Sequence, residues 1–248
     1  MSQLAHTRPR SATEIIDASF RFYRARFGDL LVVSALLLVP PALLEAIAPS
    51  WLQRVIQLAG NWMYLIGEGA IAILVAAALE RSEALSASDV FRQLGGRSGK
   101  VINVSIMSGF MVVLGLILFI IPGIIALSWT MVALPVAAIE GLSNSPALSR
   151  SRALARGRMG HVLGTMLLVW VIVLALVLGV SLVLGLVAGL IGLPDRLTDM
   201  IAQLVMVPLF PLIGVAVTLL YYDLRVRSEG ADVSAMIDAL PATPAEAS

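Results

Sequence analysis

Residues 161–191 read HVLGTMLLVWVIVLALVLGVSLVLGLVAGLI. After its first position this stretch has no acidic or basic residue, and it is longer than the roughly 20 apolar residues that a helix needs to cross the hydrocarbon core of a bilayer. Open strands leave backbone polar groups unsatisfied in lipid, so a segment that crosses as a single unit has to be helical. The stretch therefore predicts an α-helical membrane protein.

The composition of the whole chain agrees with this prediction. Of the 248 residues, 59% are hydrophobic and 13% are charged, and the mean hydropathy is +0.94. A soluble domain is typically about half apolar and about a quarter charged. The net charge of +1 gives no support for a nucleic-acid partner, and the lack of cysteine excludes disulfides and thiolate chemistry. A cleaved signal peptide is not expected, because the first apolar run starts only near Leu30.

Six apolar segments are long enough to span a membrane. The first is interrupted by Pro40-Pro41, and the sixth contains Pro208 and Pro211; we expect helix kinks at these four prolines, since proline removes a helix hydrogen bond. The predicted spans are about Leu30–Ala48, about Asn61–Leu79, Val101–Ile121, a fourth from the Pro122-Gly123 turn to Glu140, His161 to about Ile191, and about Leu197–Leu220.

The basic residues indicate how these spans are oriented. Lys and Arg concentrate on the cytoplasmic side of membrane proteins. Six spans with both termini inside place 15 of the 17 basic residues in the cytoplasm and leave only Arg54 and Arg196 outside. With five or seven spans, one terminus would lie on the outer side, and the basic segments would be divided between the two sides of the membrane. The predicted outward turns are those near Arg54, Pro122 and Arg196. The cytoplasmic set is Arg8, Arg10, Arg21, Arg24, Arg26, Arg81, Arg92, Arg97, Lys100, Arg150, Arg152, Arg156, Arg158, Arg225 and Arg227.

Three of the basic segments end in one pattern, Arg-x-Gly-x followed by two apolar residues: RFGDLL from Arg26, RSGKVI from Arg97 and RMGHVL from Arg158. Each follows a segment that can form a surface helix, and each opens a pair of spans. Alternatively, Arg-x-Gly is simply a common way to enter a span. The predicted fold class is thus an all-α integral membrane protein of six transmembrane helices in three hairpins, each preceded by a cytoplasmic-side amphipathic helix, N-in and C-in.

The domain organisation follows from these units. Residues 12–228 form a single membrane domain, with possible repeat units at 12–80, 88–140 and 145–224, between a disordered tail of residues 1–11 and a cytoplasmic tail of residues 229–248. In the first surface helix, Ile16, Phe20, Tyr23 and Phe27 fall on one stripe. Such a helix lies in the headgroup region. The expected partners are therefore the bilayer and the anionic lipid headgroups at the basic segments.

Two carboxylates fall inside the predicted spans. Glu68 lies about two turns in from the outer end of its span, and Glu45 follows the Pro-Pro pair. Ionisable residues within a membrane are costly and are often functional. Gln203 lies at a similar depth to Glu68, so we expect Glu68 to face the bundle and to interact with Gln203, directly or through a water. In the alternative, Glu68 is protonated and bonded to another neighbour, and Glu45 reaches water or Arg54.

The last span ends in LLYYDLRVRSEGAD, from Leu219 to Asp232. Tyr221 and Tyr222 lie where an aromatic belt belongs, and the helix is expected to end at Glu229-Gly230. Glu140 ends the fourth span at the same depth, and a half-desolvated carboxylate prefers an arginine partner. We therefore predict a charge cluster of structural role at the cytoplasmic boundary, in which Glu140 pairs with Arg225, Arg150 or Arg152, and Asp223 pairs with a nearby arginine such as Arg227.

No catalytic or metal-binding motif accompanies these residues. His6 and His161 are far apart and lack the spacing of a zinc or di-iron site. The stretch GGRSGK at Gly95–Lys100 has the wrong spacing for a phosphate loop. We therefore predict no metal, no cofactor and no enzymatic activity.

Three stretches resemble segments of the membrane-domain family named after glycerophosphoryl diester phosphodiesterases. They are EIIDASFRFYRARFGDLL (Glu14–Leu31), LPVAAIEGLSNSPALSRSRALARGRMGHVLG (Leu134–Gly164) and YYDLRVRSEGAD, which begins at Tyr221. The resemblance implies a bacterial or archaeal multi-pass inner-membrane protein. In some proteins of that family the region adjoins a catalytic barrel, a fold of about 250 residues. Membrane spans take up the present chain, so the barrel is expected to be absent and no particular activity is implied.

Three functional hypotheses follow. The leading one is an inner (plasma) membrane protein without catalytic machinery, acting as a scaffold or accessory protein at the cytoplasmic leaflet. The alternative is a small transporter or channel with a pathway near Glu68 and the Pro208/Pro211 kink, since kinked helices line substrate sites in some transporters. The third, a lipid-headgroup hydrolase, has least support because no metal set, nucleophile–base pair or phosphate loop is found.

Overall fold

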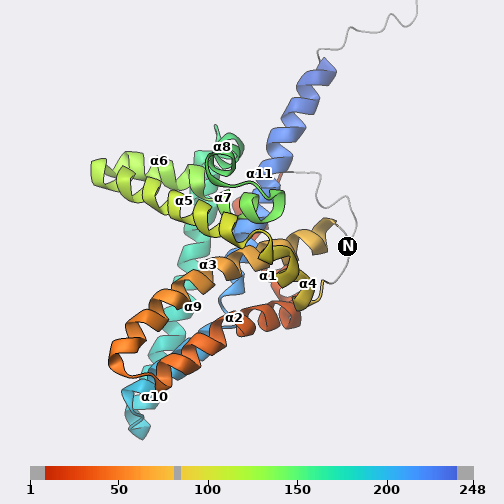
Figure 1. Cartoon of the computed structure of the whole chain (residues 1–248). Coiled ribbons are helices and arrows are strands. Elements are labelled where there is room, and N and C mark those ends of the chain that lie inside the picture. The colour runs from red at the N-terminus through yellow and green to blue at the C-terminus, as the bar shows by residue number, and fades with distance from the viewer. Residues whose placement is uncertain (1–8, 81–84, 239–248) are drawn as a thin grey trace, which may run out of the picture.

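The structure is a computed structural model that describes residues 9–80 and 85–238, and within these ranges the chain is helical without a strand (Figure 1). Six helices are long and apolar enough to cross a membrane, as expected for a multi-pass membrane protein. Consecutive long helices contact each other in three pairs, which we call hairpins. The first is α2 (Phe27–Ile47) with α3 (Ser50–Glu80), and the second is α5 (Ser98–Leu118) with the span Ile120–Glu140, which begins as α6 (Ile120–Thr130). The third is α9 (Met159–Ile191) with the span that comprises α10 (Asp195–Met206) and α11 (Pro211–Asp238).

A short helix precedes each hairpin: α1 (Ala12–Ala25), α4 (Ala87–Gly95) and α8 (Asn144–Ala155). In α1, Ser11 and Glu14 form a capping box, which satisfies backbone N–H groups at the start of the helix. The fully buried face of α1 holds Ile15, Ser19 and Phe22, one position away from the aromatic stripe predicted from the sequence. That stripe is only partly buried, and it forms the flank of the helix rather than its packed face.

The three Arg-x-Gly stretches adopt the same local structure. Arg26, Arg97 and Arg158 each lie directly before the first residue of a long helix, with φ/ψ of −121°/26°, −123°/−8° and −126°/21°. In each case the arginine N–H still bonds back into the short helix, and its carbonyl accepts the first bond of the long helix. The three long helices therefore begin with the same local backbone conformation, although the connections before them differ in length.

The short helices pack in a cyclic order. Helix α4 packs on α3 of the first hairpin, and α8 packs on α6 and α5 of the second. Helix α1 packs on α11 and α9 of the third hairpin, which closes the ring. Each short helix therefore covers the hairpin of the unit before it. The element order matches the units expected at residues 12–80, 88–140 and 145–224, and their origin as a repeat stays a prediction.

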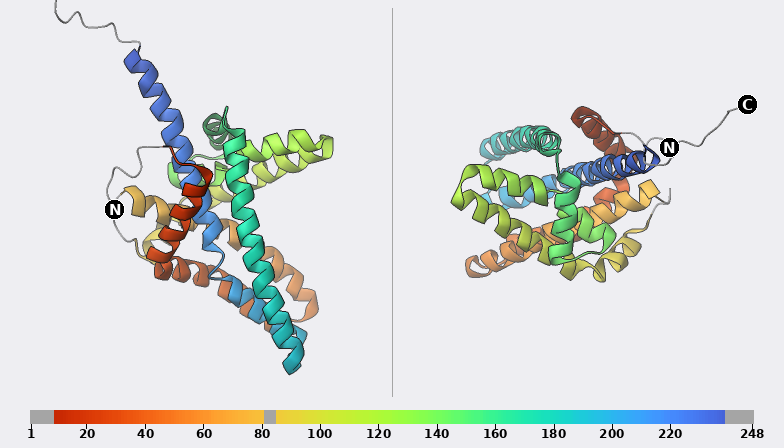
Figure 2. Two further views of the ribbon diagram at one scale, coloured as in Figure 1. Left: turned by 180° about the vertical axis from the view of Figure 1, so that it is seen from behind. Right: turned by 90° about the horizontal axis from the view of Figure 1, so that it is seen from above.

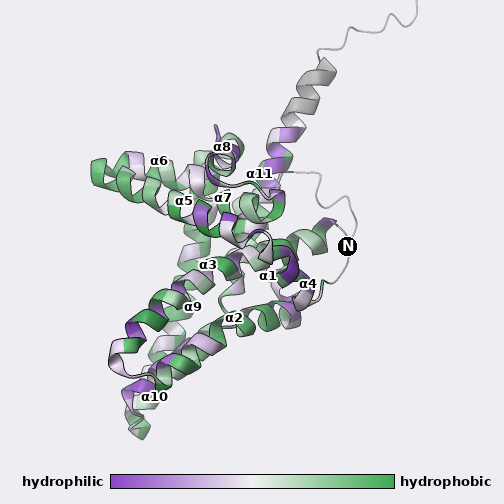
Figure 3. Cartoon of the chain, viewed as in Figure 1, coloured by the Kyte–Doolittle hydropathy of each residue, from purple (hydrophilic) through white to green (hydrophobic). Residues whose placement is uncertain are grey.

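The hairpins start from one end of the molecule, formed by α1, α4, α8 and the charged part of α11, which we call the basic end. Its core lies where α3 and α11 meet, around buried Ile71, Val75, Leu220 and Leu224. Views from opposite sides show α5 and α6 pointing away from the other two hairpins (Figures 1 and 2). Hydrophobic residues cover the hairpins, whereas hydrophilic residues gather at the basic end and along α10 (Figure 3).

The prolines do not act as predicted. Helix α2 runs without interruption through Pro40 and Pro41. In the sixth span the expected kink is a break, because α10 ends at Met206 and Pro211 begins α11, where its missing N–H costs nothing. The carbonyl of Pro208, inside the break, accepts a 2.7 Å hydrogen bond from the Tyr23 hydroxyl of α1. A short helix thus satisfies a backbone group that the break releases.

Three boundaries also differ from the predicted ones. The second span begins at Ser50 rather than near Asn61, and α11 continues past Glu229-Gly230 to Asp238. The fourth span breaks after Thr130 into α7 (Ala133–Pro135) and the π-helix η2 (Val136–Glu140). Most of the predicted N-terminal tail, residues 1–8, and residues 239–248 of the C-terminal tail lie outside the described residues, as does Arg81.

Candidate functional site

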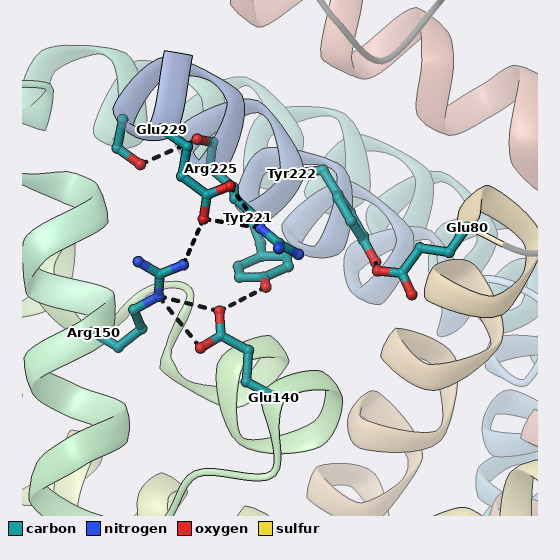
Figure 4. Close-up of polar contacts among 8 residues, drawn as sticks. Glu80, Glu140, Arg150, Tyr221, Tyr222, Arg225 and Glu229 are labelled. Carbon is teal, nitrogen blue, oxygen red and sulfur yellow. Dashed lines mark hydrogen bonds and ion pairs between the residues drawn. The ribbon is translucent and has the colours of Figure 1, made fainter. Parts of the chain in front are cut away.

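The predicted charge cluster lies at the basic end (Figure 4). Arg150 of α8 lies between two carboxylates: its Nε is 3.2 Å and 3.3 Å from the two Glu140 oxygens, and its Nη2 is 2.8 Å from Glu229. Arg225 approaches Glu229 from one turn back, with its Nε 3.1 Å from both oxygens. The pair predicted between Glu140 and Arg150 is present. The four side chains connect η2, α8 and α11.

Two adjacent tyrosines of α11 reach the ends of two hairpins. The Tyr221 hydroxyl donates a 2.8 Å hydrogen bond to Glu140, and the Tyr222 hydroxyl donates a 2.7 Å hydrogen bond to Glu80 (Figure 4). Tyr221 is fully buried, so its predicted place in a lipid-facing aromatic belt is wrong. Glu80 was not predicted as a site residue. The signal was available, because Glu80 and Glu140 are the last residues of the first two hairpins.

Asp223, the residue after Tyr222, forms a second centre on α11. Its side chain is fully buried and accepts bonds from Arg227 Nε at 2.7 Å and from the backbone N–H of Arg10 at 2.5 Å. The Nε2 atom of His161 lies 2.8 Å from the same carboxylate. Arg227 also donates to the Arg10 carbonyl. The predicted Asp223–Arg227 pair is therefore present, and it additionally binds the start of α9 and the segment before α1.

Arg152, also predicted for the cluster, does not join it. Its guanidinium lies over the Trp129 ring, 4.0 Å from the ring centroid. Two other cations bind the end of η2 instead. Arg97 donates to the carbonyls of Ala138 and Ile139 at 2.6 Å and 3.1 Å, and Lys100 donates to Gly141 at 2.8 Å. Both satisfy carbonyls at a helix C-terminus, where cations are favoured.

The electrostatics of the cluster centre on Arg150. Burial lowers the pKa of its guanidinium, but the hydrogen bonds to Glu229 and Glu140 outweigh burial and raise that pKa above its usual value. Arg150 is therefore a permanent cation between two acids. No group of three or more His, Cys, Asp and Glu side chains suited to a metal occurs among the described residues. The arrangement as it stands can hold η2, α8 and α11 in a fixed relation.

The second predicted site, Glu68 with Gln203, is not formed. Gln203 of α10 instead donates a 2.9 Å hydrogen bond to Glu45, which also accepts one of 2.5 Å from Gln57. The break between Met206 and Pro211 lets α10 pack on α2, which brings Gln203 to Glu45. The carboxylate of Glu68 faces the bundle as expected, but against Gly214 of α11, where an added Cβ would lie 2.7 Å from its Oε2. Within residues 9–80 and 85–238 it has no hydrogen-bonding or ionic partner.

The residues around Glu45 enclose two adjoining cavities between α2, α3 and α10. One, of about 150 Å³, is lined by Glu45, Gln57, Arg196, Asp199 and Gln203. The other, of about 200 Å³, shares Glu45, Gln57 and Gln203 and extends along α3 to Asn61 and Tyr64. One turn beyond Tyr64 is Glu68, and the Phe210 ring lies between the two levels, edge-on to Tyr64 at 5.3 Å and against Gly67. An aromatic side chain thus separates this polar region from Glu68.

Comparison of the chain with protein-family models, with curated proteins and with solved structures finds no match. The resemblance to the phosphodiesterase membrane-domain family therefore stays a prediction, based on the three stretches that carry it.

Proposed function

We propose that the protein is a multi-pass protein of a bacterial inner membrane that has no catalytic machinery of its own and serves as a membrane scaffold or accessory protein at the cytoplasmic leaflet. The observation that carries this proposal is how the charges at the basic end are used. Glu140, Arg150, Glu229 and Asp223 all bind side chains or backbone of other helices. Charges bound in this way stabilise a rigid surface rather than present a reactive group.

In this proposal the basic end faces the cytoplasm, with both termini on that side and the three hairpins inserted from it. The distribution of arginines supports this orientation, since Arg54 and Arg196 are the two basic residues near the opposite ends of hairpins. Helices α1, α4 and α8 then lie at the cytoplasmic headgroup level, and the basic residues there meet anionic lipid.

Site-specific photo-crosslinking in native membranes tests the proposal. A photoreactive residue at exposed Arg156 of α8 is expected to give discrete protein adducts, while one at exposed Trp51 of α3 gives lipid adducts only. The matched position Arg92 samples a different short helix of the same end. Absence of protein adducts from Arg92 and Arg156 alike would contradict the proposal.

A transporter is the second candidate, favoured by the polar cavities around Glu45 and by Glu68, which has no partner among the residues that the structure describes. Intramembrane acids facing a cavity mark pathways in many transporters. Purified protein in liposomes that moves a solute or protons, and loses this movement on Glu68→Gln, would replace the scaffold proposal. The control is Glu80→Gln, since Glu80 lies at the basic end and bonds to Tyr222.

A further inference from the structure

A cavity of about 390 Å³ lies between α5, α6 and α8, outside the charge cluster. One side is polar: Ser145, Ser149 and Arg152 line it from α8, where their spacing of four and three residues puts them on one face of the helix. The other side is apolar, with Met107 and Met111 one turn apart on α5. Because α5 starts at the basic end, the methionines lie deeper along the hairpin than the polar stripe.

Arg152 differs from its neighbour Arg150 in what it binds. Arg150 contacts two carboxylates, whereas Arg152 has no acidic partner among the described residues and rests on Trp129. No carboxylate lines the cavity. The guanidinium is therefore held in place by a ring while its N–H groups remain available, a suitable arrangement for binding phosphate through two hydrogen bonds.

We propose that this cavity binds an anionic phospholipid. The phosphate lies at Arg152 with the Ser145 and Ser149 hydroxyls, and the start of one acyl chain lies along Met107 and Met111. The order of polar and apolar walls fits an amphiphile that enters from the headgroup level with its tail toward the membrane centre. This deepens the proposed function, on which it rests for assigning the lipid to the cytoplasmic leaflet.

Native mass spectrometry of the detergent-purified protein tests the site. With added phosphatidylglycerol, wild type is expected to retain one lipid that Arg152→Gln binds about tenfold more weakly, as expected for loss of a charge-assisted contact. Arg156→Gln is the matched control, since Arg156 is an exposed arginine at the C-terminal cap of α8, four residues after Arg152 and outside the cavity. Equal losses in the two variants would mean general charge attraction and overturn the site.

Two further arms separate a lipid site from a phosphate site. Met111→Phe, which fills the apolar wall without changing charge, is expected to weaken phosphatidylglycerol binding, provided that its melting temperature stays at the wild-type value. Inorganic phosphate and glycerol 3-phosphate are expected not to displace the lipid at millimolar concentration. Displacement by either, or unchanged binding in a stable Met111→Phe, would overturn the phospholipid assignment. Because the protein is purified, the result does not depend on the proposed orientation or scaffold role.

A second feature concerns the tip of the α5–α6 hairpin. From Gly109 to Leu127 no side chain contains nitrogen or oxygen, and this stretch includes the turn itself. Ile117 and Phe119 at the turn are each 75% exposed. The turns of the other two hairpins, in contrast, carry Arg54 and Arg196 close by.

The turn is also built with few free backbone groups. Phe119 is the single residue between the two helices, and its N–H donates to the Gly115 carbonyl at 3.0 Å. Pro122 has no N–H to satisfy. Gly115 and Gly123 let the two legs touch, since a Cβ on Gly115 would lie 2.9 Å from the Gly123 Cα. A turn with few unsatisfied backbone groups has a lower free-energy cost of insertion into hydrocarbon.

The α5–α6 hairpin points in a different direction from the other two and contains no helix as long as α3 or α9 (Figures 1 and 2). At 1.5 Å per residue, the 21 residues of α5 extend about 31 Å, as do the 21 of α2, against about 46 Å for the 31 of α3 and about 50 Å for the 33 of α9. We infer that the tip of the α5–α6 hairpin ends within the hydrocarbon and does not reach the outer surface. Because both helices of the hairpin end on the same side of the membrane, the distribution of arginines between the two sides is the same as for a hairpin that crosses.

Spin labels in the cysteine-free chain test this depth. In reconstituted protein, a label at Ile120→Cys is expected to be accessible to oxygen but not to a water-soluble nickel complex. Labels at Trp51→Cys and Arg196→Cys, in the other two hairpins, are expected to show the reverse. Nickel accessibility at position 120 equal to that at position 196 would overturn the inference.

Discussion

Tyr221 and Glu140, 81 positions apart, share a 2.8 Å hydrogen bond that joins α11 to the end of the second hairpin. The next residue, Tyr222, does the same for Glu80 at the end of the first hairpin. One turn of α11 therefore holds the C-terminal ends of both preceding hairpins. What looks in the sequence like the place where a helix leaves the bilayer is, in the structure, the point at which the three hairpins are joined.

The substitution Glu140→Gln is expected to lower the melting temperature in detergent. It removes the charge that pairs with Arg150, whose side chain is 32% exposed, so solvent screening limits the effect to about 1 kcal/mol. A double-mutant cycle with Arg150→Gln should give a coupling energy of that size. Arg156→Gln, an exposed arginine on the same helix, is the control and should change little. Additive effects of the two substitutions would contradict the pairing.

Asp223→Asn is expected to destabilise the protein more than Glu140→Gln does. The Asp223 side chain is fully buried and accepts bonds from Arg227 and the Arg10 backbone, with His161 against it. Removing its charge weakens the bonds that this buried side chain accepts and takes the carboxylate partner from Arg227, which is 25% exposed, at a cost of about 2 kcal/mol. Asp17→Asn, at an exposed acid of α1, is the matched control. Equal melting temperatures for the two variants would show that the Asp223 centre does not stabilise the fold.

The sequence allows contacts between residues close together in the chain to be predicted, but not contacts that depend on which hairpins pack side by side. Asp223 and Arg227 are one helical turn apart, and Glu140 and Arg150 flank a short connection, so their pairs follow from spacing. The bonds of Glu80 to Tyr222 and of His161 to Asp223 depend on α11 packing beside α3 and α9. No local pattern in the sequence specifies that arrangement.

The Glu68–Gln203 prediction was wrong for a related reason. It placed the outer end of the second span near Asn61, which would put Glu68 about as deep as Gln203, whereas α3 starts at Ser50 and Glu68 therefore lies much further from the outer end than Gln203 does. Proline chemistry pointed to a kink but did not distinguish a kink from a break. With the helix broken between Met206 and Pro211, Gln203 meets Glu45 on α2, and Gly214 lies against Glu68.

Gly123→Ala is expected to open the α5–α6 hairpin. An added Cβ would lie 2.9 Å from the backbone nitrogen of Leu116, which cannot move without displacing α5. Overpacking of this kind typically costs about 1–3 kcal/mol. Gly109→Ala is the matched control on the same hairpin, since nothing lies within 4 Å of its added Cβ. Measured melting temperatures should fall for Gly123→Ala only, and a fall of equal size for both variants would mean that the close approach of the legs is not what Gly123 serves.

Cysteine labelling with a membrane-impermeant maleimide tests the orientation of the basic end. The natural chain has no cysteine, so each label reports one position. Arg92→Cys on α4 and Arg156→Cys on α8 are expected to be protected in intact cells and labelled after the membrane is opened, because both lie exposed on short helices that pack at the basic end. Trp51→Cys and Arg196→Cys, at the far ends of the first and third hairpins, are expected to be labelled in intact cells. Because α4 and α8 both pack on hairpin helices at the basic end, positions 92 and 156 are expected to lie on the same side. Labelling of one but not the other in intact cells would therefore contradict the packing itself, whereas labelling of both, with positions 51 and 196 protected, would invert the orientation and leave the fold unchanged.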